Sequence, residues 1–183
     1  MGKLHDALST PMIDFIGRQK LFFVATAAPG SRINLSPKGL DSFRILNERR
    51  VLWLNLTGSG NETAAHVQQD SRMTIMFCSF EGAPLILRLY GSARAVHRND
   101  PDWSDLLARF GTLPGARQIF DLTVESVQTS CGNAVPCFQY VGDREQLTDW
   151  LKKKGDDGVA QYWRTTNQFS IDRLPTHIME KNG

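Results

Sequence analysis

Residues 52–67 read LWLNLTGSGNETAAHV, an apolar strand that passes through a glycine-bracketed turn into a predicted helix. Ser59 and Glu62 have the spacing of a capping box, which predicts a helix that begins at Gly60. Gly58 and Gly60 allow a close approach of the backbone, and the free amides of a first helical turn favour an anion. The junction therefore predicts an anion-binding site, while turn capping alone would explain the same residue types.

Closely spaced strands flank this junction on both sides. They are rich in β-branched and aromatic side chains and are separated by turns such as APG at 28–30 and EGAP at 81–84. The predicted strands cover residues 21–27, 31–36, 50–56, 72–80, 85–97 and 117–130. Strands in such close succession indicate antiparallel pairing, and closure of the sheet removes its open edges. We predict a mainly β fold, a small β-barrel with flanking helices.

Helices are predicted near the N-terminus, in one connection and in the last third of the chain. Their apolar residues recur at helical spacing and their ends carry Pro, Gly and capping residues. The predicted helices begin near residues 10, 60, 100, 144 and 157. No linker or repeat divides the 183 residues. We therefore predict a single domain over 1–183 whose C-terminal part, from about 142 to 183, is a helical extension.

Composition excludes several classes of function. The 21 basic and 19 acidic residues nearly balance, so no net field attracts nucleic acid or an anionic membrane surface. No apolar run approaches the ~20 residues of a membrane span, and the first ten residues lack a signal sequence, which predicts a cytoplasmic protein. The three cysteines, Cys78, Cys131 and Cys137, have no metal-ligand spacing. We expect no metal site, and we interpret Cys131 as a packed turn residue.

Three motifs in order resemble a known family. They are FFVATA at 22–27, NLSPKG at 34–39 and the turn and helix at 57–67. Together they resemble the pyridoxamine 5'-phosphate oxidase-like family of FMN-binding split β-barrels over residues 11–130, and QTSCG at 128–132 resembles an uncharacterised subgroup. The resemblance implies an antiparallel, Greek-key-like split barrel, a small-molecule substrate, and a homodimer with two FMN sites at the subunit interface.

The resemblance also implies where FMN would bind. Lys38 falls where the family places a lysine close to the flavin, and a cation there would stabilise reduced flavin. The oxidase proper carries adjacent Arg and Lys at the phosphate position, whereas this chain offers Ser59, Asn61 and Thr63. These uncharged donors can hold a phosphate, but its affinity should be lower unless Arg or Lys comes from elsewhere in the chain. The candidates for that charge are Lys38, Arg32, Arg72 and Arg88.

Further positions complete the predicted cofactor site. These residues are Ser36, Asn55, Arg88, Gln128, Ser130 and Trp163. Arg88 lies on a strand that contacts flavin in the family, and Gln128 and Ser130 end a strand whose polar side chains face the ring. Trp163 matches an aromatic position near the flavin. The competing interpretations are a surface charge for Arg88 and a helix-core residue for Trp163.

We expect an FMN-dependent oxidoreductase that acts on an unidentified small molecule, with no catalytic side chain assigned. Pyridoxamine 5'-phosphate oxidase activity itself is not expected, because the C-terminal arginine motif of the oxidase matches only loosely. One alternative is a non-catalytic flavin-binding or flavin-storage protein. Others are a split barrel that uses haem or a deazaflavin, and a structural dimer with an empty cleft.

Overall fold

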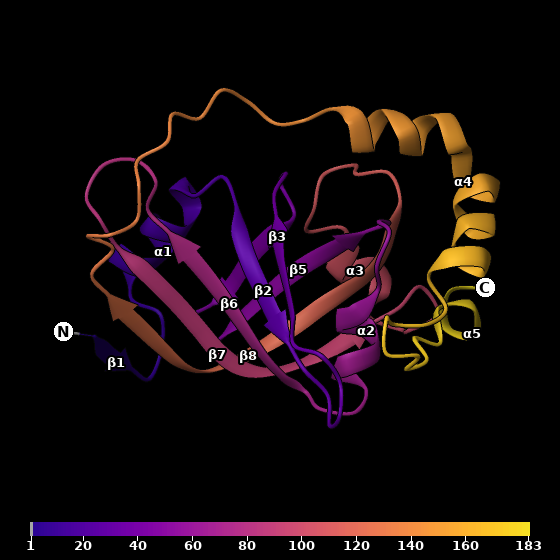
Figure 1. Ribbon diagram of the computed structural model, residues 1–183, viewed down its shortest axis with the longest axis horizontal. Coiled ribbons are helices and arrows are strands. Elements are labelled where there is room, and N and C mark those ends of the chain that lie inside the picture. Colours follow the sequence, from indigo (N-terminus) through magenta and orange to yellow (C-terminus); the bar gives the residue numbers. More distant parts are fainter. Residues whose placement is uncertain (1) are drawn as a thin grey trace.

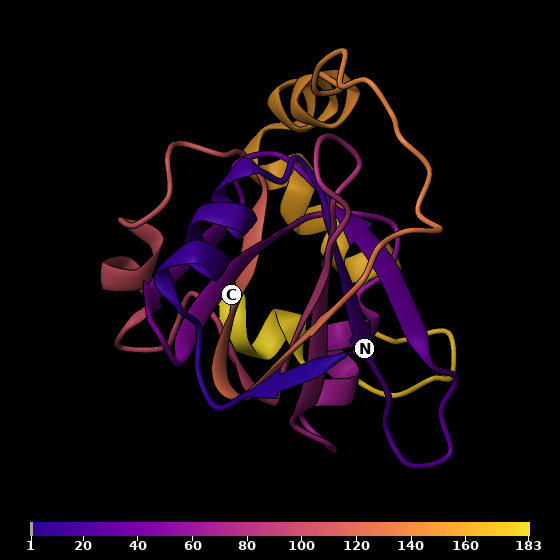
Figure 2. The ribbon, with the colours of Figure 1, turned by 90° about the vertical axis from the view of Figure 1, so that its left-hand side faces the viewer.

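A computed structural model describes residues 2–183, whose centre is an eight-stranded antiparallel sheet curled around the core (Figure 1). The strands are β1 (Lys3–His5), β2 (Phe22–Thr26), β3 (Asn34–Lys38), β4 (Phe43–Asn47), β5 (Arg50–Leu56), β6 (Arg72–Cys78), β7 (Ile86–Val96) and β8 (Ala116–Ser130). They follow the order β3-β2-β6-β7-β8-β5-β4, and β1 adds to β8. Edge strands β3 and β4 stand at opposite ends of this order, and Figure 2 shows the sheet curving around the core. The prediction of a mainly β antiparallel fold is confirmed.

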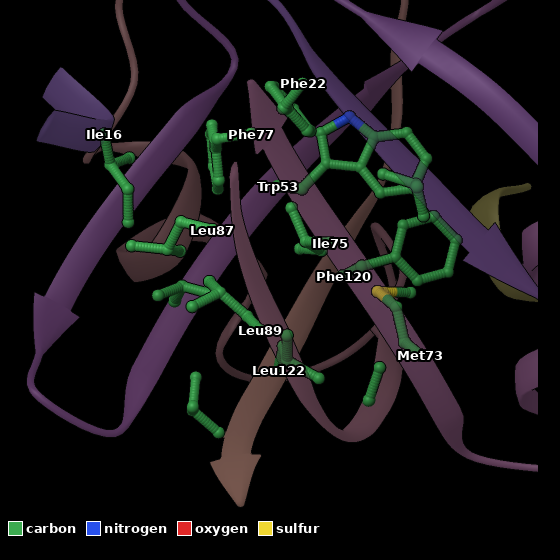
Figure 3. Close-up of a cluster of buried hydrophobic side chains, with 14 of the residues drawn as sticks. Ile16, Phe22, Trp53, Met73, Ile75, Phe77, Leu87, Leu89, Phe120 and Leu122 are labelled. Carbon is green, nitrogen blue, oxygen red and sulfur yellow. The ribbon is translucent and has the colours of Figure 1, made fainter. Parts of the chain in front are cut away.

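The core forms because alternate residues of neighbouring strands turn to the same side of the curled sheet. Leu87 and Leu89 of β7 are fully buried, whereas Arg88 and Tyr90, which alternate with them, lie on the outer face. Trp53 stacks on Phe120 with 4.8 Å between ring centres, inside the apolar cluster of Figure 3. Full burial of each large apolar side chain contributes about 1.5–3 kcal/mol, so this cluster stabilises the barrel.

Within the described part of the chain, five helices flank the barrel. They are α1 (Thr10–Arg18), α2 (Glu62–Val67), α3 (Trp103–Leu107), α4 (Gln146–Thr166) and α5 (Ile178–Asn182). The two helices predicted in the last third of the chain join as α4, which bends at Gly155, where φ is 64° and ψ is 176°. Glycine adopts this left-handed conformation without the steric cost that a Cβ imposes. None of the helices within residues 2–183 combines the length and apolar character that a membrane crossing requires.

Three elements were not predicted. Strand β1 has three residues and exists because it pairs with the distant end of β8, with Leu4 opposite Gln128. Strand β4 has half-buried residues on both faces and no alternation that would mark it. Helix α5 depends on the buried residue Ile178, which packs against α4. In all three cases long-range packing, rather than a local pattern, forms the element.

The C-terminal extension reaches the barrel through a long irregular segment. Residues 131–145 leave β8, pass over one end of the barrel and lead into α4 (Figure 1). The second half of α4 then returns to the barrel, where Trp163 is buried at 2% exposure. Consequently the loop that follows β5 lies between the barrel and the C-terminal extension.

Gly91 is the position where the fold tolerates a side chain least. The register between β7 and β8 shifts at Tyr90–Gly91, and a Cβ on Gly91 would lie 2.0 Å from the backbone oxygen of Thr123. We predict that Gly91→Ala lowers the free energy of unfolding by about 1–3 kcal/mol, as overpacking of a core does. Urea denaturation measures the change.

Gly17→Ala is the matched control, because a Cβ there meets nothing within 4 Å and the residue lies in α1. This variant should be neutral or gain up to about 1 kcal/mol. Equal stability of the two variants would contradict the close approach at Gly91.

Candidate functional site

A cavity of about 780 Å³ opens where β3, β5 and the loop after β5 meet the start of β8. Its lining comes from residues 34, 36–40, 42, 53–63 and Arg117, together with Lys20 and Leu21. Tyr140, Arg144 and Leu147 of the C-terminal extension also line it. Ligand sites typically measure about 300–1,000 Å³, so this cavity has the size of a cofactor or substrate site.

Arg117, the second residue of β8, is the main charged group of the cavity. Its side chain is 3% exposed; Nη1 donates to Oδ1 of Asn167 at 2.8 Å and Nη2 donates to the backbone oxygen of Gly60 at 2.6 Å. The buried Nε has no partner, and no carboxylate among residues 2–183 forms an ion pair with this guanidinium. Burial lowers its pKa to about 9. Neutral oxygens do not compensate the charge of this buried cation, so the charge remains available to attract an anion.

Lys38, at the end of β3, supplies a second positive charge. Its Nζ lies 5.0 Å from the centre of the Trp53 ring, an arrangement that favours a cation. Burial, and to a lesser extent the charge of Arg117, lowers the Lys38 pKa to about 8. The two cations share one cavity and repel each other, so an anion between them would relieve the repulsion.

Acidic side chains also line the cavity, but Glu62 is engaged elsewhere. Both oxygens of its carboxylate accept the backbone N–H of Ile171, at 3.1 and 3.0 Å. Asp143 lines the side formed by the C-terminal extension, next to Arg144. Neither carboxylate forms an ion pair with Arg117, so this arginine keeps its positive charge without an acidic partner.

Uncharged polar groups surround the two cations. Nδ2 of Asn55 donates to Oε1 of Gln118 at 3.0 Å, while Nε2 of Gln118 is buried without a partner. Asn61 is 2% exposed, and its buried Oδ1 also lacks a partner. Thr63 accepts a hydrogen bond from Nδ2 of Asn34 at 3.2 Å. Buried polar groups are normally satisfied, so unpaired atoms at and beside one cavity are typical of a ligand-binding site.

The structure brings together six of the ten predicted cofactor residues. The residues that line the cavity are Ser36, Lys38, Asn55, Ser59, Asn61 and Thr63. Arg88, Gln128 and Ser130 lie instead on the outer face of the barrel, where Nη1 of Arg88 donates to Oγ of Ser130 at 3.2 Å. Trp163 lies behind the loop and donates from Nε1 to Oγ1 of Thr57 at 2.8 Å, as a helix-core residue.

The predicted capping box is wrong. Helix α2 begins at Glu62 rather than Gly60, and Asn61, not Ser59, is its N-cap, without a side-chain hydrogen bond. The Glu62 carboxylate cannot fold back onto the cap because the Ile171 amide engages it. Ser59 is therefore an exposed loop residue at the rim of the cavity.

The cation at the phosphate end of the cavity was not predicted either. Arg32 pairs with Asp172 and Arg72 pairs with Asp70, both on the surface and outside the cavity lining. Arg117 supplies that charge; it was assigned only to a strand, although an arginine within an apolar strand is itself a signal of a special environment. The packed interpretation of Cys131 is also wrong, because this cysteine is exposed.

Comparisons with known proteins assign this chain to a family. Residues 11–131 match the family model described as pyridoxamine 5'-phosphate oxidase. The pyridoxamine 5'-phosphate oxidase family protein ustO of Aspergillus flavus is 40% identical over 191 aligned residues, which cover 93% of this chain and 76% of that protein. The chain belongs to the pyridoxamine 5'-phosphate oxidase family.

Solved structures agree on the fold. A candidate pyridoxamine 5'-phosphate oxidase of Lactobacillus delbrueckii, 19% identical, has a TM-score of 0.55 over 67% of this chain and 94% of its own. HupZ of Group A Streptococcus, 21% identical, has a TM-score of 0.52 over 66% of this chain and 91% of its own. At these identities the likeness shows the fold alone, and it confirms the predicted split barrel.

Lys38 gives a prediction for pH dependence. Because its pKa is about 8 in the folded state and 10.5 ordinarily, the unfolded chain binds more protons between these values, and stability rises with pH there. We predict that Lys38→Met is more stable than the parent at pH 7, and that the difference shrinks as the pH rises from 8 to 10.5. Urea unfolding at several pH values measures it.

Lys152→Met, on the exposed side of α4, is the matched control for the loss of a lysine. Its difference from the parent should stay constant with pH. If the difference in unfolding free energy between Lys38→Met and the parent also stayed constant with pH, the charged form of Lys38 would not be destabilised by its surroundings.

Proposed function

We propose that the cavity binds FMN and that the protein is an FMN-dependent oxidoreductase acting on a small molecule. The observation that carries this proposal is Arg117, which is buried at the cavity and, among residues 2–183, has no carboxylate partner and an unpaired Nε. Burial of an uncompensated charge is costly, so an arginine in this state favours a ligand that brings the opposite charge.

The phosphate end of FMN fits the surroundings of Arg117. The guanidinium lies beside the Gly60 backbone oxygen, and Ser59 and Asn61 of the same loop line the cavity. Hydrogen bonds from a cation to a phosphate are roughly twice as strong as neutral ones, so Arg117 makes up for the uncharged side chains of this loop. It takes the place of the adjacent Arg and Lys of the oxidase proper.

The other end of the cavity fits a ring system. Trp53 contributes an aromatic surface, Asn55 and Ser36 contribute polar groups, and Lys38 contributes a cation. A bound flavin would supply the hydride or electron chemistry, and a nearby cation would stabilise the negative charge of its reduced form. The protein would bind and orient the ring and hold the charge of Lys38 beside it.

Haem is less well matched to this cavity. Haem iron is held by His, Cys, Met or Tyr, and the lining within residues 2–183 contains only Tyr140 of these types. A deazaflavin with a phosphate would meet the same cations as FMN. A non-catalytic flavin protein would bind FMN equally and differ only in showing no turnover with NADH or NADPH.

We also propose a homodimer formed through the outer face of the barrel. Phe23, Met76, Arg88 and Gln128 stand side by side across β2, β6, β7 and β8, and all four are half-exposed. No helix lies in front of β2, β6 and β7 in Figure 1. Arg88 and Gln128 do not line the cavity of the chain to which they belong. They would reach a cofactor only if it were bound to a second copy across the interface.

Arg117→Met tests the cofactor proposal. The variant removes the buried charge but keeps a long side chain, so FMN should bind at least ~10-fold more weakly, the loss of one charge-assisted interaction. Quenching of flavin fluorescence measures the dissociation constant. Arg164→Met, on the exposed side of α4, is the control and should bind FMN like the parent. Equal affinity of Arg117→Met and the parent would contradict the assignment.

Met76→Glu tests the dimer. The variant places one unpaired negative charge from each copy at the centre of the proposed interface, and these like charges disfavour association. We expect the parent to elute as a dimer and Met76→Glu as a monomer in light scattering coupled to gel filtration. Gln69→Glu, exposed beyond α2, controls for the added charge. A monomeric parent would overturn this proposal and leave the cavity assignment intact.

A further inference from the structure

Asn167 connects the C-terminal extension to the anion end of the cavity. It directly follows α4 and is fully buried. Its Oδ1 accepts Nη1 of Arg117 at 2.8 Å, and its Nδ2 donates to the backbone oxygens of Gly58 at 3.0 Å and Ser59 at 3.4 Å. Its own backbone oxygen accepts Nδ2 of Asn61 at 3.3 Å. One side chain and its carbonyl thus contact both the cation and the loop that form this end.

We infer that Asn167 is a positioning residue that orients Arg117 and residues 58–61 to receive a phosphate group. The inference rests on the proposed function, because it names the residue that prepares the same site. It also assigns a role to the C-terminal extension: its buried residues Trp163, Asn167 and Thr176 are a structural part of the phosphate site.

The chemistry of the amide explains why asparagine serves here. An amide presents an acceptor to the guanidinium and donors to the two backbone oxygens at the same time. A carboxylate at residue 167 would neutralise the charge of Arg117. It would also have no N–H to donate to the backbone oxygens of Gly58 and Ser59, so these oxygens would repel it. A neutral amide oxygen instead fixes the guanidinium and leaves its charge available to a ligand.

The surrounding extension holds Asn167 and the loop in place. Oγ1 of Thr176, a fully buried residue, donates to the backbone oxygen of Asn167 at 2.7 Å. Nε1 of Trp163 bonds to Thr57 at the start of the loop, and the amide of Ile171 bonds to Glu62 at its end. The loop is therefore anchored at both ends and in the middle by residues outside 11–131, the part that matches the family model.

The test compares Asn167→Asp with Gln168→Glu. Both variants change an amide to an acid at adjacent positions, but Gln168 is exposed and donates only to the backbone oxygen of Arg164. Calorimetric titration with FMN, riboflavin and inorganic phosphate gives the affinities, and circular dichroism with thermal unfolding verifies folding. Asn167→Ser, which removes the amide without adding charge, is the second variant should Asn167→Asp fail to fold.

We expect Asn167→Asp to bind FMN and inorganic phosphate at least 10-fold more weakly than the parent, with riboflavin binding changed less than 3-fold. Asn167→Ser should lose FMN affinity by a smaller factor, and Gln168→Glu should match the parent. A merely structural role would weaken FMN and riboflavin alike. That result, or unchanged FMN affinity in a folded variant of Asn167, would overturn the inference.

The parent protein separates this inference from the proposed function. If it binds inorganic phosphate but not FMN, and Asn167→Asp loses phosphate, the FMN proposal fails and the positioning role stands. If it binds FMN and the folded Asn167 variants do so equally well, the positioning role fails and the FMN proposal stands. If it binds neither ligand, both are wrong.

Discussion

The guanidinium of Arg117 is buried without a carboxylate, and the surrounding structure is arranged to hold it there. Burial of an unpaired charge costs several kcal/mol unless hydrogen bonds offset it. Here the Asn167 side chain and the Gly60 backbone oxygen take two of its donors, and Nε remains unpaired. Both partners are neutral, so the positive charge remains for a ligand. The anion that we propose to bind here would offset the cost of this burial to the stability of the ligand-free protein.

The barrel determines where this charge lies. Strands β5 and β8 are antiparallel, with Asn55 opposite Gln118 and Leu56 opposite Ala116. The loop that leaves β5 is therefore next to the residues that begin β8, and Arg117 contacts it directly. The C-terminal extension closes the same region from behind, through Trp163 and Asn167. The sheet register and the extension together place the cation of Arg117 beside the loop after β5, which has no basic residue of its own.

The sequence predicted the barrel, the loop after β5 and Lys38, because each leaves a local pattern of alternation, glycines or motif residues. It did not reveal Arg117 or Asn167, whose roles depend on contacts between residues 50 or more positions apart, from Arg117 to Asn167 and from Gly60 to Arg117. It also misassigned Glu62, since the capping box is a local pattern that a distant amide, that of Ile171, overrides. Local signals thus identified the cavity, and long-range contacts determine its charge.

Membership of the pyridoxamine 5'-phosphate oxidase family favours FMN, and the positive charge of the cavity fits its phosphate. The most direct measurement is the visible absorption spectrum of the purified protein after incubation with FMN and gel filtration. The account predicts flavin bands that correspond to about one FMN per chain. Absence of retained flavin at every FMN concentration would contradict it and would favour a different ligand for the Arg117 site.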